Sequence, residues 1–218
     1  MNSKIFSYEN ENVEVTWDKH RCIHAKECVH GLPEVFDISK KPWINPDGQT
    51  DIEKLKEVIG KCPTGALMYK LANGDIEPIP STNTITIVED GPVYVEGDIL
   101  IQDTDGNELL KDIRVALCRC GASSNKPLCD NAHLKKDFKA DDSYNPERLL
   151  LEPTEHVNGP LTITMIPNGP FVVNGNYEVH GKDSSVTKTE KKMSFCRCGA
   201  STNKPFCDGT HRSIGFEA

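Results

Sequence analysis

The sequence has little apolar material for its length. Of its 218 residues, 37% are hydrophobic and 6% are aromatic. No stretch approaches the roughly 20 consecutive apolar residues that a membrane span requires. This composition does not favour one large hydrophobic core. It indicates small units that need an additional stabiliser, of which a bound metal is one.

Basic residues are also in short supply. The 25 Lys and Arg residues face 33 Asp and Glu residues, which gives a formal net charge of −8. This balance argues against nucleic acid or an anionic membrane as a partner, because both attract basic surfaces. The first residues, MNSKIFSYENENVEV, contain no apolar run and do not resemble a signal peptide. We therefore expect a cytoplasmic protein, whose thiols stay reduced.

Common catalytic motifs are missing as well. The sequence has no G-x-G-x-x-G, no P-loop, no G-x-S-x-G and no H-E-x-x-H. Each of these motifs places groups that bind nucleotides, attack acyl groups or hold a catalytic zinc. We therefore expect a protein that is not an enzyme.

Cysteine, by contrast, is abundant. The nine cysteines fall into three groups of three: Cys22, Cys28 and Cys62; Cys118, Cys120 and Cys129; Cys196, Cys198 and Cys207. An odd number cannot form a complete set of disulfides. In a chain without an export signal, such groups indicate metal binding before disulfides.

The second and third cysteine groups belong to an internal repeat with a period of 78 residues. Residues 84–138 (the first repeat) align without a gap on residues 162–216 (the second repeat). The blocks CRCGASSNKPLCDNAH and CRCGASTNKPFCDGTH are the most similar part. Each repeat opens with alternating apolar residues, an Asp-Gly or Asn-Gly turn and a second apolar stretch, which predicts two strands. Two copies suggest modules packed about a pseudo-twofold axis.

The first 80 residues have a different pattern. Alternation of Val13, Val15 and Trp17 predicts a strand. Thr50 and Glu53 predict a capping box at the start of an amphipathic helix of about ten residues, which Gly60 ends. Residues 141–161 are expected to form a linker that contacts the rest once, at residues 149–151. The fold class expected for the whole chain is α+β.

Each repeat carries the spacing C-x-C-x8-C-x3-H. The two donor sets are Cys118, Cys120, Cys129 and His133, and Cys196, Cys198, Cys207 and His211. Three thiolates and an imidazole suit one tetrahedral zinc ion. They also suit a 2Fe-2S cluster in which one histidine replaces a cysteine. The spacing alone leaves both open.

The full string C-x-C-x2-S-x3-P-x-C-D-x-x-H resembles the CDGSH iron-sulfur family, to which the NEET proteins belong. The second repeat reads CDGTH, and the first reads CDNAH, with Asn131 where the family has Gly. The resemblance implies one 2Fe-2S cluster per repeat. One iron would be held by the first two cysteines and the other by the third cysteine and the histidine. It also implies a pseudo-dimer of β-rich modules, since NEET-type proteins work as dimers.

Several neighbours of these ligands have predicted supporting roles. Ser123 and Ser201 are expected to donate hydrogen bonds to sulfur. Asp130 and Asp208 suit the start of a helix. Arg119 and Arg197, which lie between two ligands, are expected to offset cluster charge.

The N-terminal triad resembles a divergent single-cluster ferredoxin. Cys22, Cys28 and the Cys62-Pro63 pair match three of the four usual ligand positions, while Ala25 stands at the fourth. Three thiolates suit a 3Fe-4S cluster directly. A 4Fe-4S cluster would need another ligand, such as His24, Glu27 or water. His20, His30, His156 and His180 are interpreted as surface or turn residues.

These patterns predict a ferredoxin-like domain at residues 1–80, a first CDGSH module at 81–140, the linker at 141–161 and a second module at 162–218. We expect a monomer whose two modules form an internal pseudo-dimer. The leading functional hypothesis is electron transfer through two 2Fe-2S clusters and one 3Fe-4S or 4Fe-4S cluster. A second is transfer of clusters or iron, or redox sensing. A third is a structural zinc protein that acts as an interaction module.

Partners follow from the same hypotheses. The expected partner is a redox protein or an apo iron-sulfur acceptor. Formal charges of about −1 for each 2Fe-2S site and about −2 for a 3Fe-4S site would bring the net charge from −8 to about −12. A partner that docks by charge should therefore present a basic patch.

Overall fold

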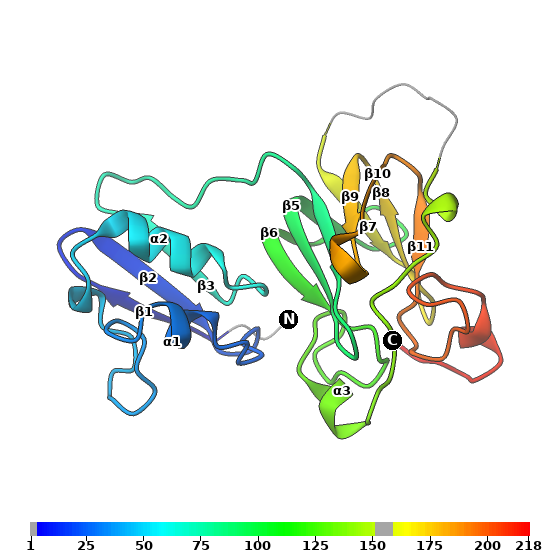
Figure 1. Cartoon of the computed structure of the whole chain (residues 1–218), viewed down its shortest axis with the longest axis horizontal. Coiled ribbons are helices and arrows are strands. Elements are labelled where there is room, and N and C mark those ends of the chain that lie inside the picture. The colour runs from blue at the N-terminus through cyan, green and yellow to red at the C-terminus, as the bar shows by residue number, and fades with distance from the viewer. Residues whose placement is uncertain (1–3, 151–158) are drawn as a thin grey trace. The chain divides into compact units, whose positions relative to one another are not determined.

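The computed structural model describes residues 4–150 and 159–218 (Figure 1). The chain forms two compact units, an N-terminal unit of residues 1–78 and a C-terminal unit of residues 79–218. Both repeats lie in the C-terminal unit. Among the described residues, no helix has the length and apolar character needed to cross a membrane.

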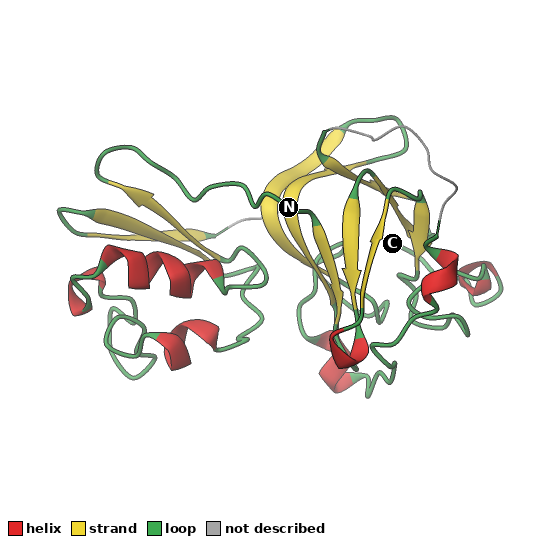
Figure 2. Cartoon of the chain, turned by 45° about the horizontal axis from the view of Figure 1, so that its top comes forward, coloured by secondary structure: helices red, strands yellow, loops and turns green. Residues whose placement is uncertain are grey.

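A three-stranded antiparallel sheet forms one layer of the N-terminal unit. Its strands are β1 (Ile5–Glu9), β2 (Val13–Asp18) and β3 (Leu67–Leu71), with β2 in the centre. Helices α1 (Glu27–Gly31) and α2 (Ile52–Gly60) cover one face of this sheet (Figure 2), and the 3-10 helix η1 spans Pro46–Gly48. The predicted strand at residues 13–17 is confirmed, because its alternating Val13 and Val15 are buried in the core.

Helix α2 starts with a different cap from the predicted one. The predicted capping box of Thr50 and Glu53 is wrong by one residue, since Asp51 is the N-cap. The Asp51 carboxylate accepts hydrogen bonds from the backbone N–H groups of Glu53 and Lys54, at 3.0 and 3.3 Å. A carboxylate there satisfies two free N–H groups and also adds negative charge at the positive end of the helix. The helix ends at Gly60, as predicted.

The C-terminal unit is built on one eight-stranded sheet. Its strands are β4 (Thr84–Ile87), β5 (Val93–Gln102), β6 (Glu108–Leu117), β7 (Leu161–Met165), β8 (Phe171–Asn174), β9 (Tyr177–His180), β10 (Val186–Thr189) and β11 (Met193–Phe195). Seven of them follow the order β10-β9-β4-β5-β7-β8-β11, and β6 pairs with β5. The short helices are α3 (Ala132–Lys135), η2 (Pro146–Arg148), η3 (Lys182–Ser184) and η4 (Thr210–Arg212).

The predicted turns between the first two strands of each repeat are confirmed. Asp90-Gly91 joins β4 to β5, and Asn168-Gly169 joins β7 to β8. Asp90 and Asn168 both have φ of 51°. Asp and Asn tolerate this left-handed conformation better than most residues, which explains their place in the turns.

Strands cross between the two repeats in a reciprocal way. Strand β4 of the first repeat pairs in parallel with β9 of the second, and Thr84 lies opposite Glu178. Strand β7 of the second repeat pairs in parallel with β5 of the first, and Thr162 lies opposite Leu100. Shifting either pair by the 78-residue period produces the other. The repeats therefore share one sheet and one core.

The predicted single contact of the segment between the repeats is wrong, because Tyr144 also packs against this core and its hydroxyl donates to the carbonyl of Val179 at 2.9 Å. Leu149 is fully buried in the core, whereas Leu150 is exposed. Leu151, which belongs to the same predicted contact, lies outside the described residues. The fold is α+β overall, with far more sheet than helix.

A core substitution tests how much the shared sheet contributes to the free energy of unfolding of the C-terminal unit. Ile101 in β5 is fully buried and lies opposite Leu110 of β6 and Ile163 of β7. Ile101→Ala should lower the free energy of unfolding by about 2–5 kcal/mol, through lost burial and the cavity left behind. Urea unfolding followed by circular dichroism and by amide exchange in β5 and β7 measures it.

Leu109→Ala is the control, because Leu109 lies in β6 with 44% of its surface exposed. It should change the free energy by no more than about 0.5 kcal/mol. Equal effects of the two substitutions would contradict a core shared between the repeats.

Candidate metal centres

The four predicted ligands of the first repeat form two close pairs. Cys118 and Cys120 follow β6 directly, and their sulfur atoms are 3.7 Å apart. Cys129 Sγ lies 3.5 Å from Nδ1 of His133, which is carried by α3. All four side chains are buried.

The second repeat has the same arrangement. Cys196 and Cys198 follow β11, with sulfur atoms 3.7 Å apart. Cys207 Sγ lies 3.4 Å from Nδ1 of His211, in η4. Here the second pair is more accessible, since Cys207 and His211 are only half-buried.

These distances match ligand pairs on tetrahedral metal ions. With metal–sulfur bonds of about 2.3 Å, two thiolates on one ion stand about 3.8 Å apart, and a thiolate and an imidazole nitrogen about 3.6 Å. Each pair therefore has the spacing of one tetrahedral edge. Within the described part of the chain, no three or more His, Cys, Asp or Glu side chains converge on one point. The thiolate and imidazole donors of each set suit a bound metal centre.

A short backbone ladder brings the two pairs of each repeat together. In the first repeat, Leu117 and Leu128 form an antiparallel bridge, and the Cys129 N–H donates to the carbonyl of Ala116 at 2.8 Å. Phe195 and Phe206 form the equivalent bridge in the second repeat. The ladder places a cysteine directly after each bridging residue, which is why ligands about ten positions apart lie in one site.

The serines in these loops do not donate to sulfur through their hydroxyls, contrary to the prediction. Ser123 Oγ donates to the carbonyl of Leu128 at 2.6 Å, and Ser201 Oγ donates to that of Phe206 at 2.7 Å. The cysteine sulfur atoms instead accept hydrogen bonds from backbone N–H groups, which the closed loop turns toward the cysteines. Ala122 N–H donates to Cys120 Sγ at 3.4 Å. The serine hydroxyls hold the loop closed.

The aspartates stabilise the turn that carries the histidine. Asp130 accepts from the backbone N–H groups of Ala132, at 3.0 Å, and Ser124, at 2.8 Å. Asp208 accepts from the corresponding groups of Thr210 and Thr202. The next residue is left-handed in both repeats, with φ of 67° at Asn131 and 90° at Gly209. Asn131 therefore adopts the backbone conformation that Gly adopts in the second repeat.

Each repeat buries the arginine that lies between its first two cysteines in the sequence. Arg119 and Arg197 are 1% and 4% exposed, and their hydrogen bonds to oxygen go to backbone carbonyls. Burial lowers the pKa of Arg119 to about 10, while Cys196 of the other repeat acts in the opposite direction. The pKa of Arg197 is likewise lowered by burial and opposed by Cys118. Each arginine thus places positive charge near the first cysteine of the opposite repeat.

The two cysteine loops are in backbone contact. A Cβ added to Gly121 would lie 2.5 Å from the carbonyl oxygen of Cys198. A Cβ added to Gly199 would lie 2.5 Å from the carbonyl oxygen of Cys120. Glycine is required at both positions by this approach and by a positive φ, of 78° and 82° respectively.

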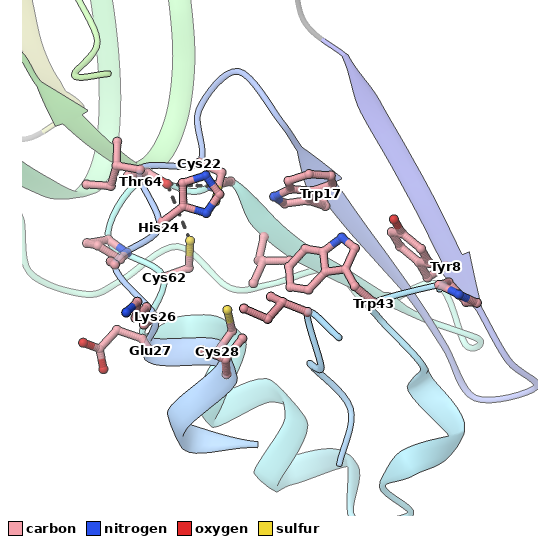
Figure 3. Close-up of a pocket in the computed structure, with 18 of the residues that line it drawn as sticks. Tyr8, Trp17, Cys22, His24, Lys26, Glu27, Cys28, Trp43, Cys62 and Thr64 are labelled. Carbon is pink, nitrogen blue, oxygen red and sulfur yellow. Dashed lines mark hydrogen bonds between the residues drawn. The ribbon is translucent and has the colours of Figure 1, made fainter. Parts of the chain in front are cut away.

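The N-terminal triad lines a cavity of about 490 Å³ (Figure 3). Cys22 follows β2, Cys28 lies in α1, and Cys62 follows α2, so the three come from different elements. Burial raises the pKa of the Cys28 thiol to about 11, and the charges of Cys62 and Cys22 add to the shift. A bound cation would offset this cost of ionising the thiols, and its binding would release protons.

Around the triad, two polar side chains contact the sulfur atoms. Thr64 Oγ1 lies 3.6 Å from Cys62 Sγ, and His24 Nδ1 lies 3.9 Å from Cys22 Sγ. His24, Ala25 and Glu27 are all exposed. The side of the site where Ala25 stands in place of the usual ligand therefore faces solvent.

Sequence reasoning missed two residues of this cavity. Trp17 and Trp43, the only tryptophans of the chain, both line it. The alternating pattern assigns Trp17 to a strand, and no sequence pattern singles out Trp43. The signal that was available is their number: two tryptophans in a chain with 6% aromatic residues, both within 45 positions of the N-terminus.

The remaining histidines are interpreted as surface or turn residues. His20 and His30 are exposed, and His180 Nε2 lies 3.1 Å from a carboxylate oxygen of Glu178. His156 lies outside the described residues.

Comparisons with known proteins match three segments of the chain. Residues 8–72 match the family described as "Divergent 4Fe-4S mono-cluster". Residues 90–134 and 168–212 match the family described as "Iron-binding zinc finger CDGSH type". The chain is similar to the "Uncharacterized protein YjdI" of Escherichia coli strains K12 and O157:H7. In each case it is 38% identical over 63 residues, which cover 29% of this chain and 82% of the relative. No solved structure matches the chain significantly.

The contact between the cysteine loops can be tested with one methyl group. Gly121→Ala should destabilise metal binding by both repeats, because its Cβ collides with the backbone of Cys198. Strain at positive φ should cost about 1–2 kcal/mol, and the collision about 1–3 kcal/mol more. Metal content per chain and the urea midpoint of the C-terminal unit measure it.

Gly106→Ala is the matched control. Gly106 has φ of 85°, and nothing lies within 4 Å of an added Cβ. It should show the strain alone and retain its full metal content. The same loss in both variants would contradict the contact between the loops.

Proposed function

Since two segments of the chain match the CDGSH-type iron-binding family and its N-terminal unit matches the divergent 4Fe-4S mono-cluster family, we propose that it is an electron-transfer protein with three iron-sulfur clusters and no enzymatic activity of its own. When bound, such clusters supply one-electron reduction and oxidation. The chain supplies ligands, hydrogen bonds to sulfur and compensating charge.

In this proposal each repeat holds a 2Fe-2S cluster. Cys118 and Cys120 would hold one iron, and Cys129 and His133 the other. Cys196, Cys198, Cys207 and His211 would do the same in the second repeat. The pairing of donors supports this assignment over a single zinc ion, which would draw all four donors around one point.

The N-terminal cluster would be held by Cys22, Cys28 and Cys62. Three thiolates suit a 3Fe-4S cluster, or a 4Fe-4S cluster whose fourth iron takes a water or a side chain such as His24. Exposure of the chain around Ala25 supports a solvent-facing corner in either case. The iron count separates the two.

The observation that carries electron transfer is the contact between the two cysteine loops. A ligand of one proposed cluster, Cys198, has its backbone against Gly121, the residue after a ligand of the other. Such contact provides a short path between two one-electron centres. We propose that the two repeats form an internal pseudo-dimer, and the reciprocal pairing of β4 with β9 and of β7 with β5 supports it.

The proposed partner is a redox protein with a basic docking surface. The chain itself has a net charge of −8, and thiolate-ligated clusters would make it more negative. Opposite charge would speed the encounter and make its rate depend on salt.

Anaerobic purification followed by spectroscopy tests the proposal. We expect a coloured protein with about eight sulfides per chain, and about seven irons for a 3Fe-4S cluster or about eight for a 4Fe-4S cluster. Absorption and electron paramagnetic resonance should show reversible one-electron reduction at more than one potential. A colourless protein with about one zinc per donor set would overturn it.

Variants then assign the signals. Cys62→Ser should remove the N-terminal cluster and leave the signals of the two repeats, because Cys62 lies in the other unit. If the remaining signals were lost with it, the three centres would not be separate sites.

A second candidate function, transfer of a cluster to an acceptor, is favoured by an asymmetry between the repeats. His133 is 8% exposed and Cys129 is 3% exposed, whereas His211 and Cys207 are half-buried. Lys136 Nζ also donates to the carbonyl of Cys120 at 3.0 Å in the first repeat. The corresponding residue of the second repeat is Ile214, which has no such donor. The second repeat is therefore the proposed donor.

Histidine replacement tests this second function. His211→Cys should slow cluster transfer to an apo-ferredoxin markedly, because a thiolate binds iron more firmly and the second repeat is the accessible one. His133→Cys, the matched control, should leave the initial rate unchanged. Absorption changes after desalting, followed over time, give the rates. Equal rates in both variants and the unmodified protein would count against cluster transfer.

A further inference from the structure

Two buried donors at the N-terminal cavity have no hydrogen-bond partner among the described residues. They are the indole Nε1 atoms of Trp17 and Trp43. A buried indole N–H usually finds an acceptor, since burying it unpaired costs free energy. Both tryptophans line the cavity with Cys22, Cys28 and Cys62. The two N–H groups therefore need an explanation.

The aromatic contacts explain one of them. Trp43 meets Trp17 edge-on, with ring centroids 5.0 Å apart and an interplanar angle of 78°. Figure 3 shows the Trp43 nitrogen on the edge that faces the Trp17 ring. In this geometry the N–H of Trp43 points at the π face of Trp17, which is a weak acceptor.

Trp17 has no such acceptor, and its nitrogen points the other way. In Figure 3 it lies on the side of the ring that faces His24 and Cys62, toward the cavity. Contacts with Trp43, at 5.0 Å between ring centroids, and with Phe6, at 5.5 Å, hold the indole in this orientation. The donor is thus held on the side of the indole that faces the cavity lined by the cysteines.

We propose that the indole N–H of Trp17 donates a hydrogen bond to a sulfur atom of the N-terminal cluster and thereby raises its reduction potential. This inference rests on the proposed function, because the acceptor is a sulfide or thiolate of that cluster. Sulfur accepts more strongly when the cluster is reduced, since its negative charge is then greater. Hydrogen bonds to sulfur are among the factors that set the potentials of such clusters. Trp17 is a positioning and tuning residue and not a ligand.

Substitution of each tryptophan by phenylalanine tests the proposal. Trp17→Phe retains an aromatic ring between Phe6 and Trp43 but removes the N–H, and should shift the midpoint potential of the N-terminal cluster to a more negative value. Trp43→Phe is the matched control, because its N–H is directed at a ring, and should shift the potential much less. Electron paramagnetic resonance during a redox titration gives both midpoints. Equal shifts in the two variants would overturn the proposal.

A measurement on the unsubstituted protein avoids any effect of the substitutions on folding. The chain is labelled with ¹⁵N in the indole rings and examined by electron-nuclear double resonance in its paramagnetic state. We expect an exchangeable proton and a ¹⁵N nucleus coupled to the N-terminal cluster, both lost in Trp17→Phe and retained in Trp43→Phe. A cluster that shows neither coupling overturns this inference alone. Absence of any cluster in the N-terminal unit overturns both it and the proposed function of that unit.

Discussion

The C-terminal unit depends on two parallel strand pairings that run between its repeats. Because β4 pairs with β9 and β5 pairs with β7, neither repeat completes its sheet with its own strands. Residues from both repeats fill one core, from Ile85 to Phe206. The same exchange sets the two cysteine loops against each other. The shared sheet is thus what positions the candidate metal sites as well as what stabilises the unit.

Around those sites, backbone N–H groups and two buried arginines lie close to the cysteines that would carry negative charge. The cysteine sulfur atoms accept hydrogen bonds from backbone N–H groups. The serine and aspartate side chains make the hydrogen bonds that keep the loops in this conformation. Positive charge comes from two arginines whose guanidinium groups are held by backbone carbonyls and lie over phenylalanine rings, Phe138 and Phe216. A buried guanidinium is unfavourable without a counter-charge. In our proposal the thiolate-ligated clusters are that counter-charge, each near the arginine of the opposite repeat.

The N-terminal unit combines a small hydrophobic core with aromatic side chains that line the cavity of the cysteine triad. Its sheet and two helices enclose Phe36, Leu55 and Ile59, and its tryptophans line the cavity beside the cysteines. Aromatic rings thus form the wall between this core and the candidate cluster. An open side near Ala25 and a closed aromatic side opposite would leave one part of the cluster in contact with solvent and the other shielded.

The sequence by itself determined the turns and the α+β fold class, and it predicted the donor sets. Cysteine spacing, the 78-residue period and the Asp-Gly and Asn-Gly pairs are local patterns, and local patterns can be interpreted without coordinates. The cap of α2 was missed by one residue, because Thr50 and Asp51 are both good caps and only the backbone path selects one. The role of the serines was missed because their acceptors lie on the other arm of a closed loop. Only the tertiary structure decided which strands cross between the repeats, that each arginine lies near the opposite repeat, and that Trp17 points an unpaired N–H into the cavity. These features join residues far apart in the chain, and their geometry follows from packing, which no local pattern encodes.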